Sequence, residues 1–252
     1  MTSRDGFIRS LTLLRDRVPS FDVYPFAIPA IRTLTTLELH PRVTFLVGEN
    51  GAGKSTLVEA VAVAAGFNAE GGSKNFRFAT RSSESSLHTV LRLSRNAKRE
   101  RDGYFLRAES YFNVATHIED LDREPGPGAP VGAAYGEASL HEQSHGESFL
   151  ALAATRLHGN GLYIFDEPEA ALSPSRQLAL LQIIDRLVRV RGSQLIIATH
   201  SPILMAYPDA TIYRLDSDGI APIAYEATEH YQITRDFLAN RERFFKHLFK
   251  DD

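Results

Sequence analysis

A glycine-rich segment near residue 50 constrains the fold of this chain more than any other feature. It reads GENGAGKST, from Gly48 to Thr56, and has the spacing G-x-x-x-x-G-K-[ST]. A short apolar run, VTFLV at 43–47, precedes it, and apolar residues at helical spacing follow it as far as Gly66. In the order strand, glycine loop, helix, successive backbone N–H groups form a cradle for phosphate oxygens at the positive end of the helix. A glycine turn that matches the spacing by chance is the alternative, which the flanking strand and helix disfavour.

The residues of this loop suit a nucleoside triphosphate with Mg²⁺. The ammonium group of Lys54 would reach the β- and γ-phosphates, and the hydroxyl of Ser55 would be a ligand of Mg²⁺. We predict that the whole loop binds the nucleotide phosphates, through Gly48, Glu49, Asn50, Gly51, Ala52, Gly53, Lys54, Ser55 and Thr56.

A second motif, LYIFDEPEA at 162–170, places two carboxylates directly after an apolar strand. The strand delivers Asp166 to its carboxyl end, where ligands of open α/β sheets bind. Asp166 would hold Mg²⁺ through water, and Glu167 would orient and deprotonate an attacking water. Acidic residues before a proline also commonly start a turn, so the catalytic interpretation depends on the phosphate loop being present.

The apolar runs predict an α/β core. The runs at 162–165 and 195–199 are typical of strands buried on both faces of a parallel sheet. Between them, residues 174–191 have helical spacing, with a predicted buried face at Leu178, Leu181, Ile184 and Leu187 or Val188. Strand, helix and strand in this order indicate a right-handed crossover.

The segment between the two motifs has a different pattern. Alternation at 86–95 and again at 103–109, around a charged turn, predicts an antiparallel hairpin. Residues 124–132, EPGPGAPVG, predict a mobile loop. Further on, we expect a short strand at 211–215 and one helix around 237–249. We therefore expect a single domain over residues 1–252, with an insertion at 67–143.

The composition is that of an ordinary enzyme-sized globular protein. The chain has 252 residues, 43% of them hydrophobic, and a formal net charge of -3. Without cysteine it can form no disulfide and no thiolate metal site, which is compatible with a reducing cytoplasm. No apolar stretch reaches the length of a membrane-spanning helix, and the first residues lack a signal-peptide core. We expect a cytoplasmic protein without direct membrane insertion.

Taken together, these motifs resemble the ABC-type ATPases, in the branch that includes RecF-like and chromosome-maintenance ATPases. GENGAGKS, SHGES, LYIFDEP, EAALS and IIATHS follow one another in that family's order across most of the chain. The resemblance implies a P-loop ATPase with a mainly parallel sheet flanked by helices, an antiparallel β subdomain and a small helical lobe. It implies ATP and Mg²⁺ as ligands, catalytic roles for Lys54 and Glu167, and a contact of His200 with the γ-phosphate.

The resemblance also gives a role to the helix start at Ser144. Ser144 and Glu147 form an ordinary capping box, which by itself indicates only a helix N-terminus. In the family, two heads face each other, and this segment of one head binds the γ-phosphate held by the other. Ser144 and Gly146 are therefore our candidates for contact with ATP in a homodimer. His145 stands where the commoner motif has glycine.

Two further family positions are less direct matches. The family usually has a Mg²⁺-contacting glutamine on the strand before the helical lobe, but no glutamine occurs between Lys54 and Gln143. Glu109 is the best substitute by position. Family members often stack adenine on an aromatic residue before the phosphate loop; Tyr24 and Phe26 are both candidates, and either could instead be a core residue.

We expect a Mg²⁺-dependent ATPase whose homodimer closes on ATP and acts as a conformational switch on a partner. The alternatives are the nucleotide-binding subunit of a membrane transporter and a DNA-associated module controlled by ATP. A basic cluster at 92–101 could contact nucleic-acid phosphates, but Glu100 and Asp102 interrupt it, and a solvated turn is the favoured interpretation.

Overall fold

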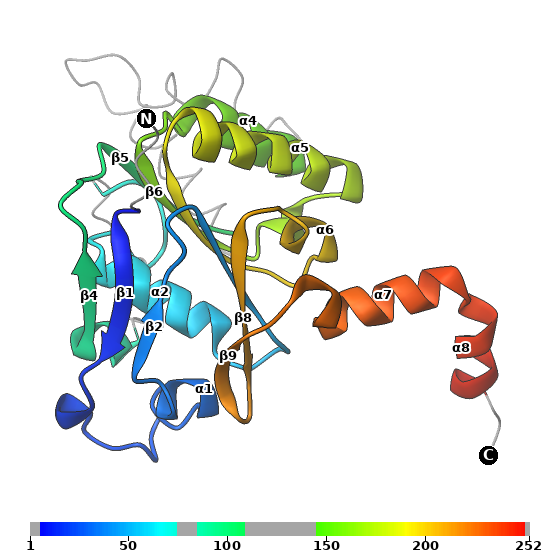
Figure 1. The fold of residues 1–252 in the computed structure, drawn as a ribbon, viewed down its shortest axis with the longest axis horizontal. Coiled ribbons are helices and arrows are strands. Elements are labelled where there is room, and N and C mark those ends of the chain that lie inside the picture. The colour runs from blue at the N-terminus through cyan, green and yellow to red at the C-terminus, as the bar shows by residue number, and fades with distance from the viewer. Residues whose placement is uncertain (1–5, 75–84, 109–144, 250–252) are drawn as a thin grey trace.

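A six-stranded sheet forms the centre of the computed structural model, which describes residues 6–74, 85–108 and 145–249. The strand order is β5-β6-β7-β3-β8-β9. Figure 1 shows the fold, with β5, β6, β8 and β9 of this sheet labelled. Neighbouring strands from β5 to β8 are parallel, and β9 pairs with β8 in the antiparallel direction. These strands are β3 (Val43–Val47), β5 (Asp102–Arg107), β6 (Gly161–Asp166), β7 (Gln194–Ala198), β8 (Ala210–Asp216) and β9 (Gly219–Pro222).

A second, smaller sheet is antiparallel and has the order β2-β1-β4. Its strands are β1 (Ile8–Leu13), β2 (Thr36–Glu38) and β4 (Leu91–Arg95). The mainly parallel sheet and the antiparallel sheet together confirm the predicted fold class. A single domain over all 252 residues stays a prediction.

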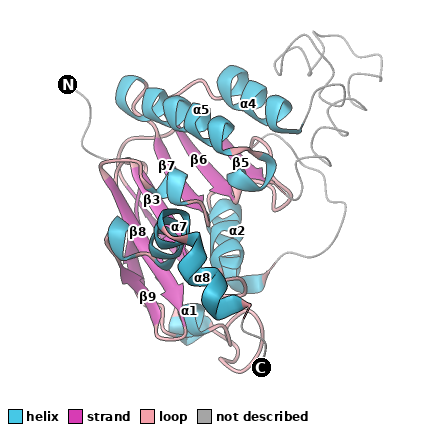
Figure 2. Cartoon of the chain, turned by 90° about the vertical axis from the view of Figure 1, so that its right-hand side faces the viewer, coloured by secondary structure: helices cyan, strands magenta, loops and turns pink. Residues whose placement is uncertain are grey.

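Helices cover both faces of the central sheet (Figure 2). On one face, α4 (His145–Arg156) and α5 (Pro174–Asp185) pack against alternate side chains of the strands, such as Phe45, Phe165 and Ile197. On the other face, α2 (Lys54–Ala64) lies between the two sheets. Strands covered on both faces need continuous apolar sequence, which is why LYIF and LIIA show no polar alternation.

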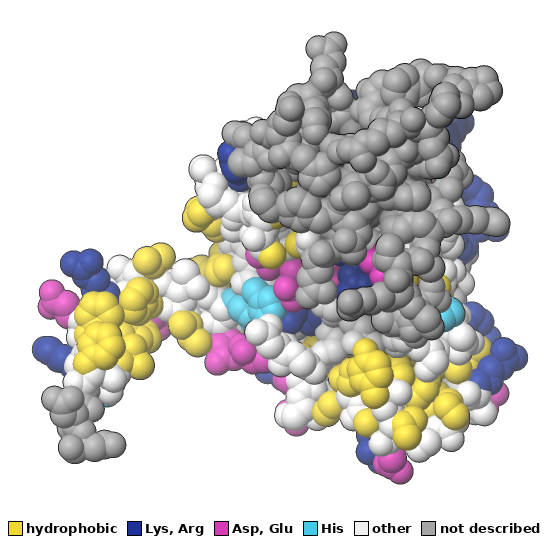
Figure 3. Space-filling model, turned by 180° about the vertical axis from the view of Figure 1, so that it is seen from behind, with side chains coloured by type: hydrophobic (Ala, Val, Ile, Leu, Met, Phe, Trp, Pro, Cys, Tyr) yellow, Lys and Arg dark blue, Asp and Glu magenta, His cyan; other side chains and the backbone are white. Residues whose placement is uncertain are grey.

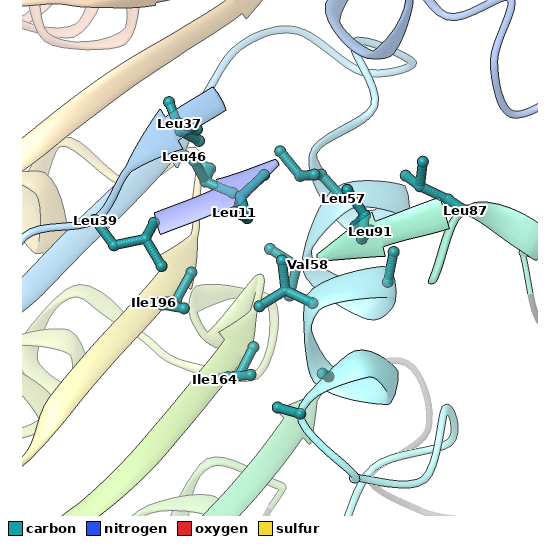
Figure 4. Close-up of a cluster of buried hydrophobic side chains, with 14 of the residues drawn as sticks. Leu11, Leu37, Leu39, Leu46, Leu57, Val58, Leu87, Leu91, Ile164 and Ile196 are labelled. Carbon is teal, nitrogen blue, oxygen red and sulfur yellow. The ribbon is translucent and has the colours of Figure 1, made fainter. Parts of the chain in front are cut away.

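Figure 4 shows the core between the two sheets. Leu11 and Leu91 from the small sheet, Leu57 from α2 and Ile164 and Ile196 from the central sheet belong to one buried cluster. The shared core fixes the start of α2 relative to β3, and so holds the glycine loop between them.

The remaining helices are short or lie near the C-terminus. They are α1 (Pro29–Arg32), α6 (Pro202–Met205), α7 (Glu229–Ala239) and α8 (Arg241–Leu248). The pair α7 and α8 extends away from the sheets (Figure 1) and exposes apolar side chains such as Leu238 and Leu248. Among the described residues, no helix is both long enough and apolar enough to cross a bilayer.

The structure corrects the predicted hairpin at 86–109. β4 pairs with β1 in the small sheet, whereas β5 pairs with β6 in the central sheet, so the two strands do not pair with each other. Both segments have their own apolar faces to bury, and these faces belong to different sheets. The predicted loop at 124–132 lies outside the described residues.

Two helix predictions are also corrected. In α5, Ile184 is buried as predicted and Leu181 packs against the core partly buried, but Leu178 is 55% exposed and Leu180 is buried instead. Leu187 and Val188 are buried as predicted, in a single π-helical turn that follows α5. The single helix expected at 237–249 is instead two helices, and the second one starts after Asn240, whose side chain accepts a hydrogen bond from the N–H of Arg243.

The turn between β4 and β5 contains a buried ion-pair cluster. Glu100 accepts hydrogen bonds from Lys74 at 2.6 Å and from Arg95 at 2.9 Å. Burial by itself raises the pKa of Glu100, but these two cations and the backbone hold the pKa at about 2. Part of the basic cluster noted in the sequence is therefore engaged inside the protein. Lys98 likewise donates to the carbonyl of Gly192 and lies over the ring of Phe7.

Candidate nucleotide-binding and catalytic site

The glycine loop connects β3 to α2 and has a backbone that requires glycine. Gly48, Gly51 and Gly53 have φ of 151°, 81° and 96°. A Cβ atom on Gly48 would lie 2.2 Å from the carbonyl oxygen of Leu215, and one on Gly53 would lie 2.8 Å from a methyl carbon of Ile28. The loop thus has both the strand-to-helix position and the close backbone packing that a phosphate cradle needs.

Lys54 is the first residue of α2 and its side chain is 3% exposed. Its ammonium group donates to the carbonyls of Gly48 at 2.9 Å and Glu49 at 3.1 Å, across the loop. Burial lowers the pKa of Lys54, and the nearby carboxylates of Glu167 and Asp166 oppose this shift. A cation held inside the loop is positioned to attract the negative charge of a triphosphate.

Three neighbouring strands bring the catalytic candidates to one edge of the sheet. β6, β7 and β3 are adjacent and parallel, so Glu167, His200 and the glycine loop all follow carboxyl ends of strands. An oxygen of Glu167 lies 4.0 Å from Nζ of Lys54 and 3.4 Å from Nε2 of His200. The structure therefore brings together Lys54, Glu167 and His200.

Glu167 occupies an unusual backbone conformation. Its φ and ψ are 50° and 52°, in the left-handed region, and its N–H donates to the carbonyl of Ala198 on β7. For a residue other than glycine, asparagine or aspartate, this region costs on the order of 1 kcal/mol. The sharp turn directs the Glu167 side chain toward the phosphate loop, and the side chain stays 35% exposed. A water molecule can therefore reach this carboxylate.

The donors expected for Mg²⁺ fit that ion chemically. Ser55 lies in the first turn of α2, and Asp166 is buried at the end of β6. A hydroxyl and a carboxylate oxygen are hard donors that Mg²⁺ accepts together with phosphate oxygens and water. Arg107, at the end of β5, has its Nε 3.5 Å from an oxygen of Asp166. The described residues contain no cluster of three or more His, Asp or Glu side chains that could hold a metal without such extra ligands.

His200 has two partners that the sequence did not predict. Its backbone N–H donates to a carboxylate oxygen of Glu169 at 2.5 Å, and the Nδ1 atom of its ring lies 2.9 Å from Nε2 of His230. Glu169 is two residues beyond Glu167, so its place in DEPE is a signal that could have found it. His230 lies thirty residues after His200, in the first turn of α7, and no local motif marks it.

The two aromatic candidates occupy different environments. Phe26 is 1% exposed and belongs to the core between the sheets, so its ring is not available to stack on adenine. Tyr24 is 68% exposed, and its hydroxyl lies 3.4 Å from the hydroxyl of Thr56 at the phosphate loop. Of the two, only Tyr24 has a free ring surface beside the site.

Beside the loop lies a cavity of about 450 Å³. It is bordered by the loop residues from Gly48 to Ala52, the end of β8, and the start of α7 with His230. Figure 3 shows histidine side chains next to acidic and basic ones near the place where the arm formed by α7 and α8 leaves the rest of the molecule.

Some predicted site residues are not placed. Ser144 and Glu109 lie outside the described residues. Helix α4 begins at His145, so Gly146 falls in its first turn.

Comparison with known proteins agrees with this geometry. A family model described as "AAA domain" matches residues 27–120, and one described as "AAA domain, putative AbiEii toxin, Type IV TA system" matches residues 133–206. The chain is a P-loop ATPase of the AAA/ABC type. In this ATPase the first match contains the phosphate loop, and the second contains Asp166, Glu167 and His200. Family membership implies ATP binding and hydrolysis. No curated protein matches the sequence.

Solved structures share the fold of this ATPase at low sequence identity. The cbiO1 protein of Clostridium perfringens, part of the ABC transporter complex cbiONQ, is 17% identical with a TM-score of 0.53. That match covers 95% of this chain and 98% of the other. A structure titled "An inward-facing conformation of a putative metal-chelate type ABC transporter" is 13% identical with a TM-score of 0.52 and covers 91% and 88%. At these identities the likeness establishes the fold.

Proposed function

We propose that this protein hydrolyses ATP with Mg²⁺ in a head-to-tail homodimer that ATP closes and hydrolysis reopens, and that this movement acts on a partner. The observation that carries the proposal is the position of the Glu167 carboxylate. It lies between the Lys54 ammonium and the His200 ring, at the edge of the sheet where the phosphate loop begins. This is where a general base must stand to activate a water in line with a terminal phosphate.

Each residue has a defined task in this proposal. Lys54 exchanges its two carbonyl contacts for oxygens of the β- and γ-phosphates, and the loop N–H groups hold the same oxygens. Ser55 and Asp166 would hold Mg²⁺, which neutralises charge that develops on the phosphates. Glu167 orients the attacking water and accepts its proton, and His200 donates a hydrogen bond to the γ-phosphate. Tyr24 supports the adenine ring.

The exposure of the site to solvent supports the proposal that a second copy of the chain completes it. Glu167 is about one-third exposed in a single chain, so bulk water reaches the place where the reaction would occur. The N-terminus of a helix from the partner subunit would exclude that water and present backbone N–H groups to the γ-phosphate. We propose that Ser144 and Gly146 of the partner subunit fill this role.

The substitution Glu167→Gln tests hydrolysis and dimerisation together. The amide keeps the shape of the side chain but cannot accept the proton, so we expect turnover to fall by roughly 100-fold to 10,000-fold. ATP binding should persist, and ATP should accumulate a dimer detected by light scattering after gel filtration. Glu242→Gln on the exposed face of α8 is the matched control, and it should keep wild-type turnover. A Glu167→Gln protein that binds ATP and stays monomeric would exclude the shared site.

A role as the nucleotide-binding subunit of a transporter is the second candidate. The two structures compared above both come from proteins described as ABC transporters, which is the reason to test this candidate second. It requires a stable complex with a membrane subunit. Purification from a native membrane extract, followed by identification of a stoichiometric membrane protein, would support this candidate over a switch that acts on a partner outside the membrane.

A DNA-associated role is the third candidate and has less support. Arg95 and Lys98 of the basic cluster are engaged in contacts inside the protein. The measurement that decides it is the ATPase rate with and without DNA at several salt concentrations. Stimulation that falls steeply as salt rises would favour this role.

A further inference from the structure

The imidazole rings of His200 and His230 form a hydrogen bond whose direction has a chemical consequence. Nδ1 of His200 lies 2.9 Å from Nε2 of His230. A hydrogen bond between two neutral imidazoles needs one N–H and one lone pair. Which ring donates therefore decides which nitrogen of His200 carries its proton.

The surroundings of Nε2 of His200 settle the direction. This nitrogen is buried, has no hydrogen-bond partner among the described residues, and faces an oxygen of Glu167 at 3.4 Å. A carboxylate only accepts hydrogen bonds, so a bare lone pair on Nε2 would be repelled, whereas an N–H there is attracted. The proton of His200 therefore belongs on Nε2, and Nδ1 is the acceptor.

We propose that His230 is a positioning residue, whose Nε2–H donates to Nδ1 of His200 and so keeps Nε2 of His200 protonated. The tautomer assignment stands on geometry alone. Its effect on turnover rests on the function proposed above, in which Nε2–H of His200 donates to the γ-phosphate. In the other tautomer, a lone pair on Nε2 would face both the phosphate and Glu167.

The charge state of the two rings agrees with this arrangement. Burial lowers the pKa of His200, and the ammonium of Lys54 lowers it further, against an opposing effect of Glu167. Burial also lowers the pKa of His230. Other charged groups acting on the pair are Glu49 and Glu229. Two rings that are neutral near pH 7 need a fixed tautomer, because neutral imidazole donates from only one nitrogen.

Hydrogen bonds anchor the start of α7 and so fix the position of the His230 ring. Thr228, just before α7, is 1% exposed and its hydroxyl donates to the carbonyl of Tyr225 at 2.7 Å. The Tyr225 hydroxyl in turn donates to the carbonyl of Pro202 at the start of α6. Since α6 follows His200 directly, both ends of the histidine pair are anchored to the same part of the fold. Outer partners of functional histidines act through this kind of orientation.

The experiment uses the full-length protein labelled with ¹⁵N-histidine. Long-range ¹H–¹⁵N spectra distinguish Nδ1–H from Nε2–H tautomers, and a His200→Gln protein assigns the signals of His200 among the nine histidines. Three substitutions are compared. His230→Gln retains a donor at the position of Nε2, His230→Phe keeps a ring without a donor, and His230→Asn carries an amide too short to reach. His247→Gln on the exposed α8 is the matched control.

We expect His200 to be the Nε2–H tautomer in the wild type and in His230→Gln, without nucleotide. In His230→Phe and His230→Asn, signals of both tautomers should appear, with kcat lower by roughly 10-fold to 100-fold and KM little changed. His230→Gln should restore kcat to near the wild-type value. His230→Phe and His230→Asn are the donor-free variants, because neither has a donor within reach of Nδ1 of His200. Thermal unfolding identifies which of the two is folded, and either one suffices.

Two results would overturn the assignment: Nδ1–H as the wild-type tautomer of His200, or an unchanged Nε2–H tautomer in a folded donor-free variant. A changed tautomer with unchanged kcat would overturn the effect on turnover. A wild-type protein that binds but does not hydrolyse ATP would refute the proposed function. The tautomer spectra are recorded without nucleotide, so they would still decide the assignment.

Discussion

We expect the substitution Gln194→Leu to destabilise the protein strongly, because the side chain of Gln194 joins the two sheets. Gln194 is the first residue of β7 and is fully buried. Its carbonyl oxygen accepts from the N–H groups of Phe7 at 2.7 Å and Ile8 at 2.9 Å. Its amide donates to the carbonyls of Ile8 at 2.8 Å and His40 at 3.0 Å.

The expected cost follows from these four hydrogen bonds. Leucine has a similar volume but neither donates nor accepts, so it leaves four backbone groups without their partner. At a net value of about 1 kcal/mol for each bond, the free energy of unfolding should fall by about 4 kcal/mol. For a chain of this length that corresponds to a Tm lower by roughly 8–16 °C.

Thermal unfolding followed by circular dichroism measures this effect, and urea unfolding checks it through the transition midpoint at constant slope. The control is Gln182→Leu on the exposed side of α5, which should change the free energy of unfolding by less than about 0.5 kcal/mol. If the Gln194→Leu and Gln182→Leu proteins melt within about 2 °C of each other, the bridging role of Gln194 is refuted.

Three further predictions follow from single positions. Gly53→Ala and Gly66→Ala place a methyl group at the same φ of 96°, but only Gly53 lies in the phosphate loop and would contact Ile28. In a fluorescent nucleotide titration we expect Gly53→Ala to lose at least 10-fold in ATP affinity and Gly66→Ala to keep the wild-type affinity. Equal affinities would contradict the cradle. Glu167→Gly should be more stable than Glu167→Ala by about 1 kcal/mol, because glycine adopts the left-handed conformation without strain. Both variants should lose ATP hydrolysis. Equal melting temperatures would show that the conformation of Glu167 carries no strain. Glu100 has a folded pKa of about 2, below its ordinary value of 4.5, so its stabilising effect is complete above about pH 4.5 and is lost as the pH falls toward 2. The difference in unfolding free energy between wild type and Glu100→Gln should shrink over that range, and a constant difference would contradict the buried ion pairs.

The sequence by itself determined the parts of this ATPase that depend on short-range pattern. The strand, glycine loop and helix at 43–66, and the apolar strands before Asp166 and His200, all lie where the pattern predicts. Their carboxyl ends could be expected at one edge of the sheet because parallel strands place their ends together. The glycine spacing and the apolar runs of buried strands lie in consecutive residues, so they can be identified without knowledge of the rest of the fold.

Only the tertiary structure decided which distant segments meet. The alternation predicts β4 and β5, although residues 86–90 form a 3-10 helix, and it does not say that each strand pairs in a different sheet. Likewise Tyr24 and Phe26 are both aromatic, and only packing made the second a core residue. His230 reaches His200 because α7 starts beside the end of β7, a contact between elements that no local pattern encodes. The physical reason is that side-chain burial and hydrogen bonding are set by neighbours in space, and these neighbours are far apart in the chain.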